Sequence, residues 1–92
     1  MTFDLGKTVV TRGVNDTIAD DKQFAIFVVN SLKRHVNGDW GDLCDEDKKT
    51  NNYAVRNGER ILSKYNFNGD VSIYIITEWD RSYTTILFPE EY

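Results

Sequence analysis

The chain has 92 residues, of which 40% are hydrophobic, 13% are aromatic and 28% are charged. A chain of this length cannot form two cores that each bury enough surface to be stable, and its apolar content excludes a disordered or collagen-like protein. One α+β domain spanning residues 1–92 is therefore predicted. Eleven Lys and Arg against fifteen Asp and Glu give a net charge of −4. This charge repels phosphate backbones, so direct nucleic-acid binding is not expected.

The sequence also indicates a compartment. It has no apolar run of the roughly 18 residues that a membrane-spanning helix needs, and its start, MTFDLGKTVV, lacks the features of a signal peptide. The single Cys44 excludes an internal disulfide and a multi-cysteine zinc site. We therefore expect a cytoplasmic protein that has no membrane segment.

The N-terminal part predicts a strand followed by a long helix. Residues 7–12 are rich in β-branched side chains and end at Gly13, and the polar residues 13–16 are typical of a turn. A helix over residues 21–37 is indicated by apolar side chains that recur at three- and four-residue steps on one face. These side chains are Phe24, Phe27, Val28, Leu32 and Val36.

Both ends of this helix carry capping signals. Asp20 is the predicted N-cap, and Gln23, three residues later, completes an acidic form of the capping box. Gly38 is the predicted stop, because glycine readily adopts the left-handed conformation that ends many helices.

The segment 39–57 predicts a second, short or broken helix. Asp42 or Asp45 is expected to cap it, and Gly58 is expected to provide a left-handed exit. Asn51 and Asn52 lower the helix propensity, so tertiary contacts must stabilise this helix. The side chains expected to supply those contacts are Trp40, Leu43 and Tyr53.

The last third of the chain predicts three strands. Residues 59–67, 70–79 and 82–88 are rich in β-branched and aromatic residues and are separated by turn signals. Asn68 and Gly69 favour a type I′ turn, because both positions of that turn require positive φ. The first two of these strands are therefore predicted to pair as an antiparallel hairpin.

A second turn at residues 80–82 returns the last strand, which ends at Pro89. The predicted order is β-α-α-β-β-β. The fold class is α+β, with an antiparallel sheet of three or four strands and with one long helix and one short helix packed on one face.

No catalytic, metal or cofactor site is expected. The strongest nucleophile pair is Cys44 with His35, but a helix-end role explains His35 and a small buried hydrophobe explains Cys44. The acids between residues 39 and 47 do not match the ligand spacing of a calcium loop. The chain also lacks the glycine-rich spacing that binds nucleotide phosphates.

Two tryptophans stand among acids beside turns. Aromatic side chains with a charged rim are typical of interaction hot spots, and an acidic rim favours a partner with a basic surface. The candidate partner-binding residues are Asp39, Trp40, Asp42, Trp79, Asp80 and Arg81. The alternative, that an indole covers the hydrophobic core, is favoured for Trp40 and stays open for Trp79.

Three sequence blocks carry a resemblance to a known family. They are NGDWGDLC at residues 37–44, ITEWDRS at residues 76–82 and the terminus TTILFPEEY. With these blocks the chain resembles a family of small proteins borne on plasmids and conjugative elements of Firmicutes, labelled plasmid-related or restriction-associated, with no established activity. The resemblance implies a mobile-element origin and a cytoplasmic location. A methyltransferase role is excluded, because such a subunit needs a longer cofactor-binding domain with a glycine-rich turn.

The leading hypothesis is a small non-catalytic protein-binding factor of a mobile genetic element. It would modulate or inhibit a host-defence nuclease of the restriction or CRISPR type through the candidate residues above. One alternative is a DNA- or RNA-binding accessory protein that uses Lys33, Arg34, Arg56 and Arg60. Another is a thiol enzyme that uses Cys44 and His35. A homodimer through an exposed edge strand also stays open.

Overall fold

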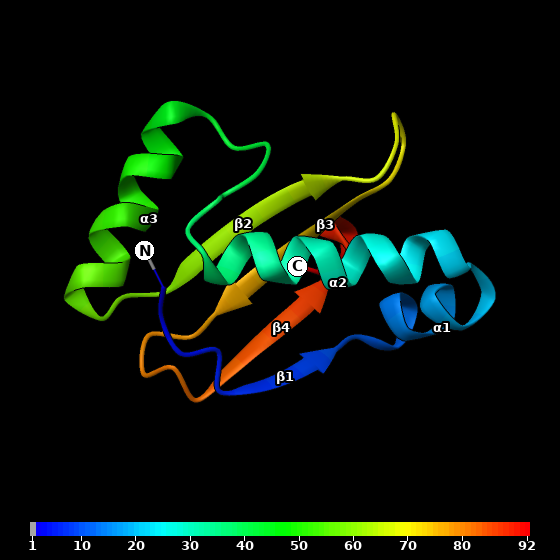
Figure 1. The fold of residues 1–92 in the computed structure, drawn as a ribbon, viewed down its shortest axis with the longest axis horizontal. Coiled ribbons are helices and arrows are strands. Elements are labelled where there is room, and N and C mark those ends of the chain that lie inside the picture. Colours follow the sequence, from blue (N-terminus) through cyan, green and yellow to red (C-terminus); the bar gives the residue numbers. More distant parts are fainter. Residues whose placement is uncertain (1) are drawn as a thin grey trace.

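The structure is a computed structural model that describes residues 2–92 (Figure 1). It has the α+β architecture predicted from the sequence, with a four-stranded sheet and three α-helices. The elements are β1 (Lys7–Val10), α1 (Arg12–Asp20), α2 (Lys22–Val36), α3 (Asp45–Asn57), β2 (Ile61–Asn66), β3 (Ser72–Thr77), β4 (Tyr83–Leu87) and the 3-10 helix η1 (Pro89–Glu91). In this part of the chain, none of the helices has the length and apolar character needed to cross a membrane.

The sheet is mixed, with strand order β1-β4-β3-β2. The predicted antiparallel pairing of β2 with β3 and of β3 with β4 is confirmed. The prediction of a purely antiparallel sheet is wrong, because β1 runs parallel to β4. Parallel neighbours need a long connection between them. Here that connection is most of the chain, and local sequence patterns do not show which distant strands meet.

Helix α1 replaces the turn predicted at residues 13–16. Thr11 caps it, since its hydroxyl accepts a hydrogen bond from the Val14 amide at 3.3 Å. The Thr17 hydroxyl donates to the Gly13 carbonyl at 2.9 Å. The residues 13–17 have low helix propensity by themselves, so burial of Val14, which is fully enclosed in the core, stabilises this helix.

Helix α2 confirms the long helix predicted over residues 21–37. The N-cap is Asp21 rather than Asp20, which is the last residue of α1. The Asp21 carboxylate accepts hydrogen bonds from the amides of Gln23 and Phe24 at 3.0 and 3.1 Å. The predicted cap was displaced by one residue, because α1 continues up to the residue before Asp21.

Helix α3 is longer and more regular than predicted. It runs unbroken for 13 residues, and its N-cap is Cys44, so neither Asp42 nor Asp45 caps it. The predicted left-handed exit at Gly58 is confirmed, with a φ of 65°. Asn51 stabilises α3 through tertiary contacts: its carboxamide donates to the Leu62 carbonyl at 2.7 Å and accepts from the Leu62 amide at 3.2 Å.

The β2–β3 connection differs from the predicted type I′ turn. Neither Asn68 nor Gly69 has a positive φ. The Asn68 side chain instead accepts hydrogen bonds from the amides of Asp70 and Val71, both at 2.9 Å. The local hydrogen bonds of this asparagine favour a wider loop, so its tolerance of positive φ is not used.

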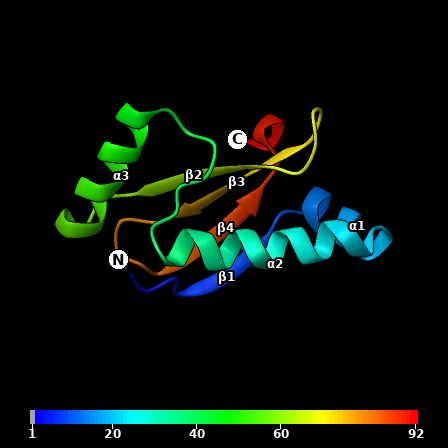
Figure 2. The same cartoon turned by 45° about the horizontal axis from the view of Figure 1, so that its top comes forward.

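Helix α2 lies across one face of the sheet, and α3 packs beside β2 (Figures 1 and 2). The larger core cluster lies between the sheet and α1 and α2, and comprises Val14, Phe24, Val28, Tyr65, Ile73, Ile75 and Ile86. The smaller cluster lies under α3 and comprises Trp40, Ala54 and Ile61. The C-terminal η1 lies on the sheet face opposite α2, and after it the Tyr92 ring packs edge-on against Tyr74 at 5.8 Å.

A chain of buried polar groups crosses the core under α2. Thr84 donates its hydroxyl hydrogen to the Leu5 carbonyl at 2.7 Å, so it must accept from Thr77, also at 2.7 Å. Thr77 must then accept from His35 Nε2 at 2.9 Å. His35 Nδ1 is left as the acceptor of the Ser63 hydroxyl at 2.6 Å. The network therefore assigns the neutral tautomer of His35 that carries its proton on Nε2.

The outer edge of β2 is covered by groups from elsewhere in the chain. The Lys64 amide donates to the Trp40 carbonyl at 3.4 Å, and the Lys64 carbonyl accepts from the Asp42 amide at 2.7 Å. Gly41, between Trp40 and Asp42, forms an isolated parallel β-bridge with Lys64. Asn66 donates its amide to the Asp42 carboxylate at 2.9 Å. Covered edges do not pair with other sheets, so β2 is closed to dimerisation, and β1 is left as the uncovered edge among the described strands.

Candidate interaction surface

Trp79 stands at the tip of the turn between β3 and β4 with 66% of its surface exposed. Glu78 donates its amide to the Tyr83 carbonyl at 3.1 Å, which closes the turn. Arg81 donates its amide to the Glu78 carbonyl at 2.9 Å and has a φ of 59°. These backbone bonds fix the turn that carries the indole.

Asp80 stabilises the same turn from its outer side. Its carboxylate accepts hydrogen bonds from the Ser82 hydroxyl at 2.6 Å and from the Ser82 amide at 3.1 Å. These hydrogen bonds, the hydroxyl's above all, lower the pKa of Asp80 below its usual value. Asp80 is therefore a fixed negative charge beside Trp79 at neutral pH.

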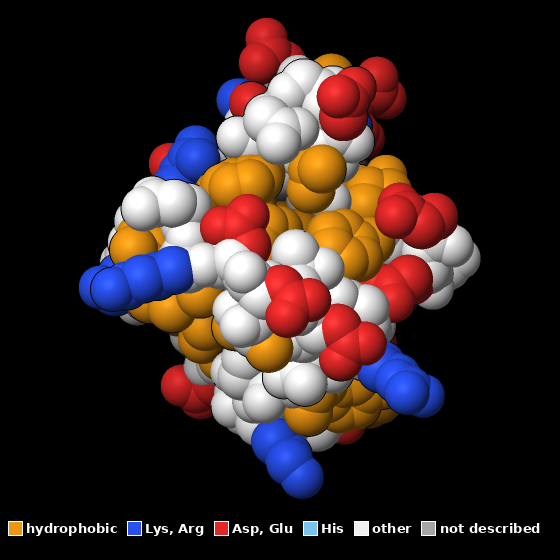
Figure 3. Space-filling view, turned by 90° about the vertical axis from the view of Figure 1, so that its right-hand side faces the viewer, with side chains coloured by type: hydrophobic (Ala, Val, Ile, Leu, Met, Phe, Trp, Pro, Cys, Tyr) orange, Lys and Arg blue, Asp and Glu red, His pale blue; other side chains and the backbone are white. Residues whose placement is uncertain are grey.

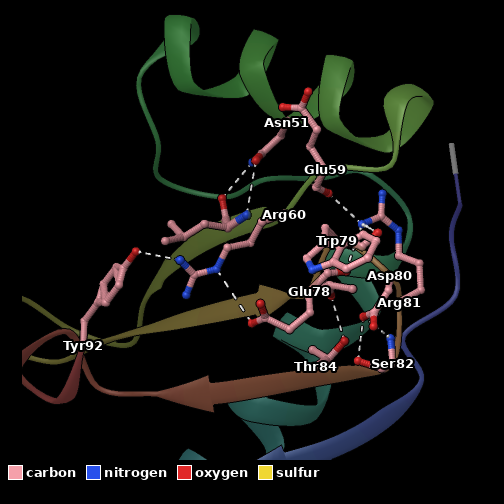
Figure 4. A network of polar contacts seen from close by, with 12 residues as sticks. Asn51, Glu59, Arg60, Glu78, Trp79, Asp80, Arg81, Ser82, Thr84 and Tyr92 are labelled. Atoms are coloured by element: carbon pink, nitrogen blue, oxygen red, sulfur yellow. Dashed lines mark hydrogen bonds and ion pairs between the residues drawn. The ribbon is translucent and has the colours of Figure 1, made fainter.

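The Arg81 side chain points inward and joins the turn to the end of α3 (Figure 4). Its Nη1 donates to the carbonyls of Glu59, Glu78 and Trp79 at 2.6, 3.0 and 3.3 Å. Its Nη2 donates to the Ala54 carbonyl at 3.0 Å. The guanidinium thus binds backbone groups at the C-terminal end of a helix, where positive charge is favourable.

Replacing Arg81 with Ala is expected to lower the free energy of unfolding by about 2 kcal/mol, because several carbonyls lose a charged donor. Arg12→Ala is the control: that side chain is 96% exposed and lies 4.0 Å from Asp16, so its loss should cost less than about 0.5 kcal/mol. Urea denaturation followed by circular dichroism measures both variants. Equal effects of the two variants would contradict the structural role of Arg81.

Acidic residues lie on and beside the turn that carries Trp79. Glu59 and Asp80 are exposed, and Glu78 forms an ion pair with Arg60 at 3.7 Å. We define the Trp79 surface as Glu59, Glu78, Trp79 and Asp80, which lie together in Figure 4. Arg81 faces inward and Arg60 offsets the charge of Glu78, so Glu59 and Asp80 give this surface its net negative charge.

The six predicted contact residues do not form one patch. Trp79 and Asp80 lie at the surface as expected, but Trp40 is only 3% exposed and belongs to the core, so it offers no indole to a partner. Its Nε1 donates to the Asn52 carboxamide at 2.8 Å. The Phe3 ring lies between the two halves, 6.0 Å from the Trp40 ring and 5.7 Å from the Arg81 guanidinium. Trp40 and Arg81 are thus connected through the buried side of the molecule and not across its surface.

Asp39 and Asp42 order the loop between α2 and α3. Asp39 accepts from Arg34 Nε at 2.7 Å and from Arg34 Nη2 at 3.2 Å, and this pairing holds the pKa of Asp39 below its usual value. Asp42 accepts from Asn66 on β2. Both carboxylates therefore have partners within the chain.

The structure also shows where the residues of the thiol-enzyme and nucleic-acid-binding alternatives lie. Both ring nitrogens of His35 bind hydroxyl groups, while Cys44 is exposed at the start of α3, so the predicted thiol pair is not assembled. Arg34 and Arg60, two of the four predicted nucleic-acid contacts, are paired with Asp39 and Glu78. Among residues 2–92, no group of three or more His, Cys, Asp or Glu could hold a metal ion.

Sequence reasoning missed Glu59 as a member of the Trp79 surface and missed the inward role of Arg81. Glu59 follows the end of α3, and only the packing of α3 beside the sheet brings it to the β3–β4 turn. Local sequence carries no signal for this proximity. Comparison of the chain with protein-family models, with curated proteins and with solved structures finds no match in any of the three.

Proposed function

We propose that this chain is a small, non-catalytic protein-binding factor of a mobile genetic element, acting in the cytoplasm through the Trp79 surface. Its partner is a protein with a basic surface, and the class we favour is a host-defence nuclease of the restriction or CRISPR type. The observation that carries the proposal is the indole of Trp79, 66% exposed on a turn that hydrogen bonds hold in place.

Exposure of a tryptophan ring to water is unfavourable in free energy, and its burial by a partner is favourable. A large aromatic ring that becomes buried in a partner's pocket supplies much of the binding energy of a typical hot spot. Because Arg81 is bound to four carbonyls, the turn is ordered before binding, which reduces the entropy lost on association. These features support a rigid contact site.

Charge supports the choice of partner. Asp80 follows Trp79 on the same turn, Glu59 is joined to that turn through Arg81, and the whole chain carries a net charge of −4. Complementary charge steers association and rejects acidic partners. Nucleases bind DNA through basic surfaces, because these neutralise phosphates. The resemblance to plasmid and conjugative-element proteins supports the choice of a defence nuclease.

Photo-crosslinking in host cells tests the proposal. A photoreactive phenylalanine analogue replaces Trp79 in one variant and Tyr53 in another; Tyr53 is an aromatic residue on α3 that is 52% exposed. We expect a nuclease subunit to be crosslinked from position 79 and not from position 53. With that subunit purified, Trp79→Ala should weaken binding by about 30-fold, and Tyr53→Ala by less than about twofold.

Inhibition of DNA cleavage by the purified nuclease should follow the same order among the variants. A crosslinked partner with an acidic surface, or equal loss of affinity for Trp79→Ala and Tyr53→Ala, would contradict the proposal.

A further inference from the structure

A second surface lies at the end of the sheet opposite the Trp79 surface. It is an open cavity of about 400 Å³ between α1, the start of β3 and η1. Its lining residues are Thr17, Asp70, Val71, Ser72, Phe88, Pro89 and Glu90. Figure 3 looks onto this end and shows hydrophobic side chains gathered in a hollow area, with Asp and Glu side chains around it.

The cavity exists because β4 ends opposite Tyr74 and does not reach the first residues of β3. The last pair between these strands is Tyr74 with Leu87. Ser72 has the same parity as Tyr74, so its backbone groups point toward the β4 side, where Pro89 stands. Proline has no amide hydrogen, and within residues 2–92 no main-chain hydrogen bond joins Ser72 to Pro89. The main-chain groups of Ser72 on this side therefore have no partner from β4.

The floor of the cavity is apolar and rigid. Val71 and Phe88 are partly buried and pack against the larger core cluster. The Phe88 ring lies 5.8 Å from the Phe24 ring, which in turn contacts Phe67 edge-on at 5.3 Å. Packed aromatic rings of this kind change shape little on binding. The floor can therefore accept an apolar side chain without rearrangement.

The rim of the cavity is acidic. Asp70 and Glu90 are exposed, and the cavity lining contains no Lys or Arg. Asp20, at the last turn of α1, adds a further exposed carboxylate at this end of the molecule, and that turn contains no basic residue. An apolar floor inside a negative rim is complementary to an apolar side chain flanked by positive charges.

We propose that this cavity binds an extended, basic peptide segment of another protein. One apolar side chain of the segment enters the cavity over Phe88, its Lys or Arg residues face Asp70 and Glu90, and its backbone hydrogen-bonds to the main chain of Ser72. Main-chain hydrogen bonds combined with side-chain pockets are a recurring way of binding extended peptides. The site is independent of the Trp79 surface, because the two turns lie at opposite ends of β3.

Selection from a synthetic peptide library tests the inference. The library contains hexapeptides with Leu or Phe at one central position and random flanking residues, and it is sorted on the full-length protein. We expect enrichment of Lys and Arg and depletion of Asp and Glu in the flanks. Enrichment of neutral or acidic flanks would overturn the proposal.

Amide chemical shifts of the ¹⁵N-labelled protein locate the site of a selected peptide. The largest changes are expected at residues 70–72 and 88–90, and changes centred elsewhere would overturn the proposal. Asp70→Asn combined with Glu90→Gln should weaken binding about tenfold. The control pair, Asp45→Asn with Glu46→Gln on α3, removes the same charge and should change binding less than twofold.

Equal effects of the two charge-matched double variants would show that only the net charge of the protein matters, and would contradict the proposal. Trp79→Ala should leave peptide binding unchanged. That variant therefore distinguishes a failure of the peptide site from a failure of the proposed nuclease contact.

Discussion

Acidification from pH 6.5 to pH 4 is expected to lower the free energy of unfolding by about 3 kcal/mol through His35 alone. His35 is fully buried, and burial lowers its pKa from 6.5 to about 3. The unfolded chain therefore binds a proton near pH 6.5, while the folded chain does not bind one until about pH 3. The stability that neutral His35 contributes is complete above pH 6.5 and is lost as the pH falls toward 3.

Burial of the His35 ring explains why protonation is resisted, because the charged form would lose its hydration. Protonated Nδ1 could no longer accept from Ser63, so the Ser63 hydroxyl would have to turn and accept instead. The Phe3 and Trp40 rings lie edge-on at 5.2 and 5.9 Å and offer no compensating charge. The pKa values of Asp39 and Asp80 lie below 3.8, so their stabilising contributions are lost only below about pH 4. Between pH 4 and 6.5, the change in the free energy of unfolding therefore reports the protonation of His35.

Urea denaturation at several pH values measures this dependence. His35→Gln should be less stable at pH 7 and should show a flat profile between pH 4 and 6.5, because glutamine does not titrate. If that variant does not fold, the ¹⁵N shifts of His35 in the natural sequence provide the test. Titration of His35 near pH 6.5 in the folded protein, or a proton on Nδ1 at pH 7, would contradict the derived network.

Gly41→Ala is expected to lower the free energy of unfolding by about 3 kcal/mol. Gly41 has a φ of 76°, and a methyl group there would overlap the Lys64 carbonyl oxygen and crowd the Tyr65 ring. The overlap is with backbone, so relief requires that the loop leave the edge of β2. The change would thus also weaken the cover that this loop provides to that edge.

Two glycines serve as controls for Gly41. Gly58 has a similar φ of 65° with nothing within 4 Å, so Gly58→Ala isolates the cost of the left-handed backbone, about 1 kcal/mol. Gly69 has an ordinary φ and open space, so Gly69→Ala should be neutral or slightly stabilising. Thermal unfolding compares the three variants. Equal losses for Gly41→Ala and Gly58→Ala would show that the contact with Lys64 is unimportant.

The helix and strand positions that local patterns predicted well are those where one face is buried. Phe24 and Val28 recur at helical spacing and both lie in the core under α2, and Ile73 and Ile75 alternate on the buried face of β3. Periodicity of this kind records burial directly. Gly58 was also predicted correctly, since left-handed backbone at a helix end is a local demand.

Errors arose where a polar residue has more than one way to satisfy its hydrogen bonds. Asn68 has the identity expected of a tight turn but accepts two amides in a wider loop. Asn51 weakens a helix locally and stabilises α3 through Leu62, 11 residues away. Trp40, placed among acids, has the same local signature as Trp79, yet packing encloses one and leaves the other in solvent.

Composition and local patterns are enough to predict the α+β class, the long helix, the antiparallel pairing of the last three strands and the acidic balance of charge, because residue counts, periodicity and turn signals need no knowledge of distant contacts. Four features are visible only in three dimensions: the parallel placement of β1, the burial of Trp40, the inward direction of the Arg81 side chain and the cavity beside Phe88. These features join residues far apart in the chain. Their free energies come from packing and from hydrogen bonds between distant segments, which local sequence patterns do not record.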